Sequence, residues 1–100
     1  ILDRKAWGHI FESAVGAYLV SQAFVHRFEV YYWRERNDEV DFILRKNGAI
    51  VAIEVKSNAE KQTEGLEKFK QMFNPKSAFI VGDGGISAED FFTMDIRKLF

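Results

Sequence analysis

The segment 39–56 constrains the fold of this chain more than any other. It consists of two stretches in which polar and apolar residues alternate, joined by the dipeptide Asn47-Gly48. This dipeptide is typical of a two-residue β-hairpin, because a type I′ turn needs two residues that tolerate positive φ. A turn centred there fixes the register by counting, so that Asp41 on the first strand faces Glu54 on the second. The same count pairs Lys46 with Ala49 and Leu44 with Val51.

The predicted register brings two carboxylates together. Asp41 and Glu54 are expected to be cross-strand neighbours, and the alternation of side chains places Lys56 on the same side of the sheet. Like charges directly opposite each other destabilise a strand pair. A chain keeps such a pair most readily when a cation lies between the carboxylates. The sequence therefore predicts a metal site at Asp41 and Glu54, with Lys56 beside it.

A helix is expected over residues 6–24, because apolar residues recur there at helical spacing. The helix is apolar on nearly every side, which predicts burial on more than one face. Glu12 lies on its flank, where a carboxylate is costly unless it is paired or bound to a cation. The alternative is a glutamate at the edge of the buried surface that reaches solvent.

Three further features complete the expected fold. The segment 28–33 is rich in aromatic and β-branched residues, as strands are, and the strand at 49–56 is apolar on both faces and should be central. A helix capped by Thr63 and running to Phe73 precedes a short strand at 77–81, which makes a parallel crossover. The fold class is thus α/β, a mixed central sheet flanked by helices in the order α-β-β-β-α-β.

The last fifteen residues give a weaker pattern. Ser87 with Asp90 resembles a capping box, and Asp95 is expected to cap a final turn. Residues 91–94 fit a strand or a helix. The glycine-rich loop at 82–85 lacks the Lys-Ser/Thr pair of a phosphate-binding loop, and we interpret it as a simple connection.

Composition limits the class of protein. One hundred residues suffice for one domain, here residues 1–100, with a single small core. The absence of cysteine excludes disulfides and thiolate zinc sites. No apolar run approaches the ~20 residues of a membrane span, and no secretory signal is visible, so a cytoplasmic protein is expected. The chain begins at Ile1 rather than Met, and we expect it to be a domain of a longer protein.

The formal net charge of −1 is not that of a dedicated nucleic-acid-binding domain. Any contact with DNA or RNA would come from local basic patches, and the alternative for each such residue is an ordinary solvated surface. The candidate basic residues are Arg34, Arg36, Arg45, Lys46, Lys61, Lys68 and Lys70.

The acidic residues and their places resemble the core of the restriction-endonuclease-like superfamily, the PD-(D/E)xK nucleases. Asp41 and the run Glu54-Val55-Lys56 match that signature, and Glu12 stands where related resolvases carry an acid on the first helix. Val40 replaces the nominal proline. A closer resemblance covers most of the chain: the segments 7–12, 30–34, 39–42 and 53–57 are similar to the C-terminal domain of a large bacterial and archaeal family of AAA-type ATPases. That resemblance implies an upstream ATPase domain, since this chain has no Walker motif.

The superfamily resemblance implies a set of roles. Asp41 and Glu54 would hold Mg²⁺ or Mn²⁺, and the Val55 carbonyl would add a ligand. Lys56 would orient or deprotonate the attacking water, and Glu12 would complete the metal shell or hold a metal-bound water. DNA is the expected substrate. His9 and His26 are possible additional participants, although a lone histidine is more often structural or exposed.

Three functions compete at this point. The first is a metal-dependent nuclease, with Glu12, Asp41, Glu54 and Lys56 as its catalytic residues. The second is a non-catalytic module that binds nucleic acid or protein, or regulates the attached ATPase. The third is a plain α/β domain in which Lys56 neutralises Glu54 in a surface ion pair.

Overall fold

The computed structural model of the chain describes residues 3–58 and 64–100. Its elements, in chain order, are α1 (Arg4–His26), β1 (Glu29–Glu35), β2 (Asp38–Lys46), β3 (Ala49–Lys56), α2 (Glu64–Phe73), β4 (Ser77–Gly82), α3 (Ala88–Thr93) and the 3-10 helix η1 (Ile96–Leu99). The predicted α/β fold and its order α-β-β-β-α-β are confirmed. The expected cap at Thr63 lies outside the described residues.

One mixed sheet organises the molecule, with its strands in the order β1-β2-β3-β4. The pairs β1–β2 and β2–β3 are antiparallel, whereas β3–β4 is parallel and is connected through α2. Asn47 and Gly48 have φ values of 50° and 84°, as the two-residue turn requires. The predicted pairs Lys46↔Ala49 and Leu44↔Val51 are present.

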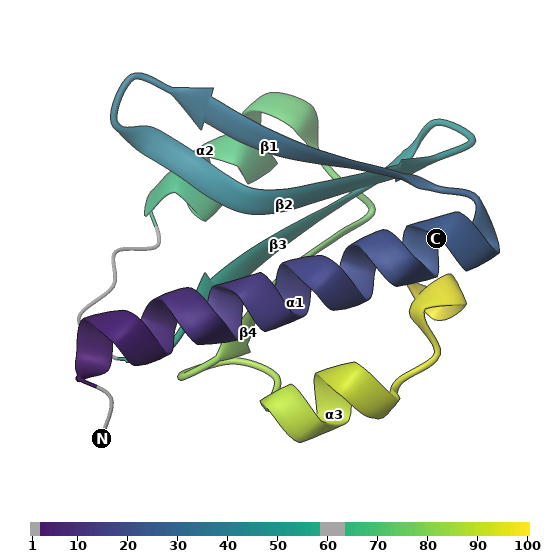
Figure 1. Ribbon diagram of the computed structural model, residues 1–100. Helices are drawn as coiled ribbons and strands as arrows, with labels where there is room; N and C mark the ends of the chain where they lie inside the picture. Colours follow the sequence, from purple (N-terminus) through teal and green to yellow (C-terminus); the bar gives the residue numbers. More distant parts are fainter. Residues whose placement is uncertain (1–2, 59–63) are drawn as a thin grey trace.

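The sheet is covered on both faces, with α1 and α3 on one side and α2 on the other (Figure 1). Side chains of β3 alternate between two cores, because Val51, Ile53 and Val55 belong to the cluster under α1 and α3. Ala52 belongs to the cluster under α2, with Leu66 and Phe69. β3 is therefore the central strand that its two apolar faces predicted.

Helix α1 departs from the prediction in one respect. Asp3 caps its start through a hydrogen bond from Ala6 N, and Arg27 ends it in the left-handed conformation. Its fully buried residues are Phe11, Val15 and Leu19, which lie along one face. The prediction of burial on more than one face is wrong in the described structure, because the sheet and α3 cover only one side of the helix.

The C-terminal region adopts the helical alternative. Ser87 caps α3 by accepting a hydrogen bond from Asp90 N, and Asp95 caps η1, as predicted. The helix buries Phe91 completely and lets Phe91 and Phe92 pack edge-on against Tyr18 of α1. Within the part of the chain that the structure describes, no helix is long and apolar enough to cross a membrane.

Candidate metal and phosphodiester site

A β-bulge shapes the end of β2 that carries Asp41. On β1, Tyr31 pairs with Ile43 and Trp33 pairs with Val40. Two residues of β2, Asp41 and Phe42, therefore lie opposite the single residue Tyr32 of β1. Such an extra residue bends the strand and changes the direction of its side chains.

The bulge turns Asp41 toward α1. The side chain is buried, with 6% of its surface exposed, and it lines a cleft of about 260 Å³. The other residues that line this cleft are Gly8, His9, Glu12, Glu39, Val55 and Ser57. The structure thus brings together Glu12 and Asp41, which stand 29 positions apart in the sequence.

The carboxylate of Asp41 accepts a main-chain hydrogen bond from β3 where the ladder between β2 and β3 has ended. The β2–β3 ladder ends at Phe42↔Ile53, one residue before the predicted pair Asp41–Glu54. Beyond that point, Oδ2 of Asp41 accepts a hydrogen bond from Val55 N over 2.7 Å. The main-chain N–H and C=O of a residue in an antiparallel strand point to the same side, so the Val55 carbonyl is also directed toward β2. Its neighbour Lys56 points its carbonyl the other way, where it accepts from Asp83 N at 2.8 Å.

Glu54 and Lys56 approach from the other face of the sheet. Successive side chains of a strand point to opposite faces of the sheet. Since Ala52 of β3 faces α2, the side chains of Glu54 and Lys56 also lie on the α2 side. The prediction that Asp41 shares a side with them is therefore wrong, and the bulge is the physical reason. Asp41 and Glu54 therefore lie near the end of the β2–β3 ladder on opposite faces of the sheet, Asp41 on the α1 side and Glu54 on the α2 side.

Glu54 is more deeply buried than a surface ion pair would be. Only 2% of it is exposed, and it lies beside Ile80 across the parallel pair. Among the described residues no hydrogen-bond donor reaches its Oε1 atom, although Glu54 has other interactions. Lys56 is half-buried, and its Nζ lies close to Gly84 in the loop after β4. This burial disfavours the third function, a plain domain with a surface pair.

The available metal ligands are therefore oxygen atoms from two faces. Within residues 3–58 and 64–100, no group of three or more His, Cys, Asp or Glu side chains forms a ready-made metal cluster. The candidate donors are the carboxylates of Asp41, Glu54 and Glu12 and the carbonyl of Val55. His9 lines the same cleft. His26 lies seventeen positions further along α1, about 25 Å away at 1.5 Å per residue, and does not belong to this site.

Sequence reasoning missed part of the cleft. Glu39 lines it and accepts a hydrogen bond from the Tyr32 hydroxyl. This hydrogen bond raises the pKa of Tyr32, with burial and the negative charges of Glu39 and Asp41 adding to the effect. Gly8 also lines the cleft, and a Cβ atom there would lie 2.9 Å from Ser57 Oγ, so the Ser57 side chain would have to turn away. For Gly8, a glycine inside a predicted helix was the available signal. The bulge that places Glu39 has no local sequence signature, so nothing in the sequence indicated Glu39.

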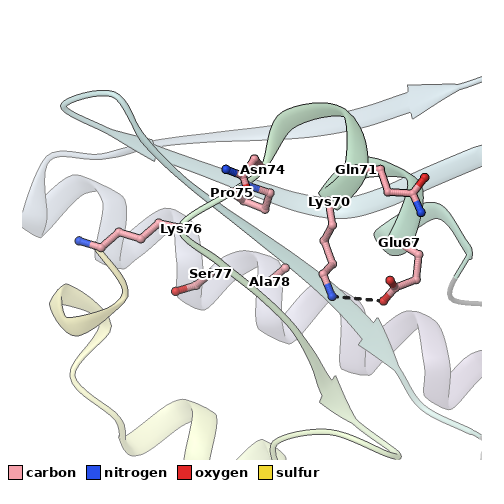
Figure 2. A pocket seen from close by; sticks show the side chains of 8 residues that line it. All are labelled: Glu67, Lys70, Gln71, Asn74, Pro75, Lys76, Ser77 and Ala78. Atoms are coloured by element: carbon pink, nitrogen blue, oxygen red, sulfur yellow. Dashed lines mark hydrogen bonds and ion pairs between the residues drawn. The ribbon is translucent and has the colours of Figure 1, made fainter.

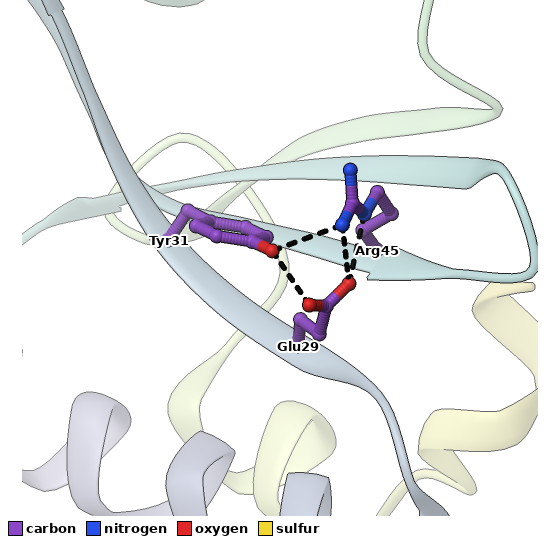
Figure 3. A network of polar contacts seen from close by, with 3 residues as sticks. All are labelled: Glu29, Tyr31 and Arg45. Carbon is purple, nitrogen blue, oxygen red and sulfur yellow. Dashed lines mark hydrogen bonds and ion pairs between the residues drawn. The ribbon is translucent and has the colours of Figure 1, made fainter.

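Several of the candidate basic residues are engaged in surface pairs. Arg45 contacts Glu29 at 2.8 Å and the Tyr31 hydroxyl at 3.1 Å (Figure 3). Lys68 lies 3.2 Å from Asp38. These contacts favour the solvated-surface alternative for Arg45 and Lys68. Lys61 lies outside the described residues.

A second cavity, of about 380 Å³, lies between the end of α2 and the start of β4. On its α2 side, Lys70 Nζ lies 3.4 Å from Glu67 Oε1 (Figure 2). The remaining lining residues are Gln71, Asn74, Pro75, Lys76, Ser77 and Ala78. This cavity lies at the opposite end of β4 from Gly82, the partner of Lys56, so it is not part of the acidic site.

Comparison with known proteins gives a family without an assigned role. Residues 7–94 match a domain of unknown function, DUF4143. Since this match spans nearly the whole chain, the protein belongs to that family. No curated protein and no solved structure matches this chain.

Proposed function

We propose that this member of the DUF4143 family is a divalent-cation-dependent phosphodiesterase domain of the nuclease type, acting beside an ATPase domain of the same chain. One observation carries the proposal. The buried Asp41 carboxylate is fixed by Val55 N where the β2–β3 ladder ends, in a cleft that also contains Glu12. Buried carboxylates are costly unless they are paired or coordinate a cation. Their concentration at one end of the sheet therefore supports a cation site.

The chemistry of the donors fits Mg²⁺ or Mn²⁺, which prefer oxygen ligands. Asp41 and Glu54 would hold the ion from the two faces of the sheet. The Val55 carbonyl would add a ligand in the plane of the sheet, because it is directed toward β2. When bound, the cation would activate a water molecule and offset negative charge on the scissile phosphate.

The remaining residues have roles of their own. Glu12 would position a water molecule from the α1 side of the cleft. Lys56, two residues after Glu54, would orient the attacking water and stabilise charge that develops on the phosphate. The resemblance to the PD-(D/E)xK nucleases and the confirmed order of elements both support this assignment.

Cation binding is tested first by thermal unfolding with and without Mg²⁺ or Mn²⁺. A cation that binds only the folded chain stabilises it by about 2.7 kcal/mol at a concentration of 100 Kd. We expect this stabilisation in the wild type and its loss in Asp41→Asn. Asp38→Asn is the matched control, because Asp38 is a half-buried carboxylate on the same strand outside the cleft. An equal response in Asp41→Asn would place the cation elsewhere.

Hydrolysis is tested on single-stranded, duplex and branched DNA with the same metals, using the protein together with its adjoining ATPase portion. Lys56→Ala should abolish cleavage while the metal-induced stabilisation remains, since Lys56 is not a ligand. Lys98→Ala, at an exposed lysine of η1 that is not one of the candidate basic residues, should cut normally. Equal cutting by wild type and Lys56→Ala would identify a contaminating nuclease.

The second candidate is a non-catalytic binding or regulatory module of the ATPase. The exposed apolar face of α1 and the net charge of −1 favour it, because both suit contact with protein more than with a polyanion. Failure of every DNA form to be cut, with the cation response intact, would select this function.

A further inference from the structure

The outer face of α1 has an unusual composition for a surface helix. Its large exposed side chains are Trp7 (52% exposed), Ile10 (46%), Val20 (61%), Phe24 (88%) and Val25 (63%). Residues 13–25 contain no Asp, Glu, Lys, Arg or His. A helix packed on a sheet normally carries charged and polar residues on the face opposite the core. A contiguous apolar face of this kind marks an interaction surface.

The side chains along this face differ in size from its ends to its middle. Ile10, Ala17 and Phe24 follow one another at intervals of seven residues, nearly two turns, and so lie almost in line. The ends of the line carry large side chains. Between Ile10 and Phe24 most of the exposed residues around Ala17 are small, namely Ser13, Ala14 and Ser21; Val20 is the large side chain among them.

We propose that this face binds a second copy of the chain, with the two α1 helices antiparallel about a two-fold axis at Ala17. In such an interface the same surface meets itself, and residue pairs exchange across the axis. Ile10 would then pack against Phe24 of the partner subunit, about 10 Å from the axis along the helix. The small residues around Ala17 would let the two helix backbones approach closely where they cross.

The size and charge of the face suit this occupant. Its five large side chains expose on the order of 500 Å², so two copies would bury about 1,000 Å², the lower limit of a specific interface. Because residues 13–25 carry no charge, two identical faces can meet without repulsion. Glu12 lies about 140° around the helix from Ala17, so the cleft remains open. The dimer therefore does not depend on the proposed nuclease chemistry.

Sedimentation equilibrium of the 100-residue chain tests the proposal over a range of concentrations. We expect a species of twice the chain mass of 11.6 kDa. Ala17→Glu and Ala17→Lys would each place like charges against each other at the axis, and each should raise the dimer Kd at least about 100-fold. An equimolar mixture of the two variants should restore the dimer. Met72→Glu is the matched control, because Met72 is a 48% exposed apolar residue on α2.

Three outcomes would overturn the proposal. They are a monomer at every concentration, dimerisation of the Ala17 variants as strong as that of the wild type, and a mixture that stays monomeric. If the chain is monomeric at every concentration, the outer face of α1 would instead contact a different protein segment. Circular dichroism checks the fold of each variant. Phe24→Glu, at the most exposed of the large side chains, provides a second disruption if an Ala17 variant fails to fold.

Discussion

Replacing Asp41 measures what holds the end of β2 against β3. Asp41→Ala removes Oδ2, which accepts a 2.7 Å hydrogen bond from the buried N–H of Val55. A hydrogen bond to a charged group contributes about 1.5–3 kcal/mol, and a buried donor left without it costs a similar amount. Asp41→Asn removes the charge but retains a side-chain oxygen in a position to accept the bond.

Comparing the two variants gives the contribution of this hydrogen bond to the free energy of unfolding. Both relieve repulsion with Glu12 and Glu39 across the cleft, so this effect cancels when they are compared with each other. We expect Asp41→Ala to be less stable than Asp41→Asn by about 1–2 kcal/mol. For a domain of this size the difference in Tm is about 5–15 °C.

The assay is urea unfolding followed by tryptophan fluorescence, with a chelator present so that metal binding does not contribute. The m-value should be the same for both variants, since the surface exposed on unfolding hardly changes. Equal free energies of unfolding would refute the reasoning. That result would mean that the contact between Asp41 and Val55 contributes nothing to the stability of the sheet.

Two further predictions concern packing and pH. Gly65→Ala should destabilise the chain by about 1–3 kcal/mol, because a Cβ atom there would lie 2.2 Å from the Glu39 carbonyl oxygen; Gln71→Ala, on the exposed side of the same helix, should be nearly neutral in urea unfolding. Hydrogen bonds from Arg97 lower the pKa of Asp95 from 3.8 to about 2, so the folded state favours the charged form. The resulting stabilisation is complete above about pH 4 and is lost as the pH falls toward 2. Asp95→Asn should therefore lose less stability than the wild type between pH 4 and 2, and parallel curves for the two proteins would contradict the assignment.

The burial of two carboxylates bears on the proposed function. Burial of Asp41 and Glu54 makes a surface ion pair with Lys56 a poor account of the acidic residues. The cation response of Asp41→Asn and the cleavage test with Lys56→Ala then separate a nuclease from a binding module. Each test uses residues whose positions the described structure fixes.

Local chemistry determined much of the fold from sequence alone. Asn47-Gly48 specified the turn and hence the register of β2 and β3, because the φ values of two residues decide the geometry of a tight hairpin. The two apolar faces of residues 49–56 identified the central strand. Ser87 and Asp95 identified helix starts, since a cap depends only on a side chain and an amide a few residues away. The candidate acidic residues were likewise chosen from local patterns, Asp41 and Glu54 from the predicted hairpin register and Glu12 from its place on the first helix.

Only the tertiary structure decided how those acidic residues face one another. Gly16 lacks a side chain, and a Cβ atom there would lie 3.1 Å from the ring of Phe42, so Phe42 can pack against α1. The bulge that accommodates Phe42 turns Asp41 toward Glu12 and away from the face of Glu54. Strand alternation cannot reveal this, because the bulge depends on pairing with β1 and packing against α1, which are distant in sequence. The uncovered face of α1 is likewise a property of the assembled fold, since apolar periodicity reports which residues can be buried but not whether anything covers them.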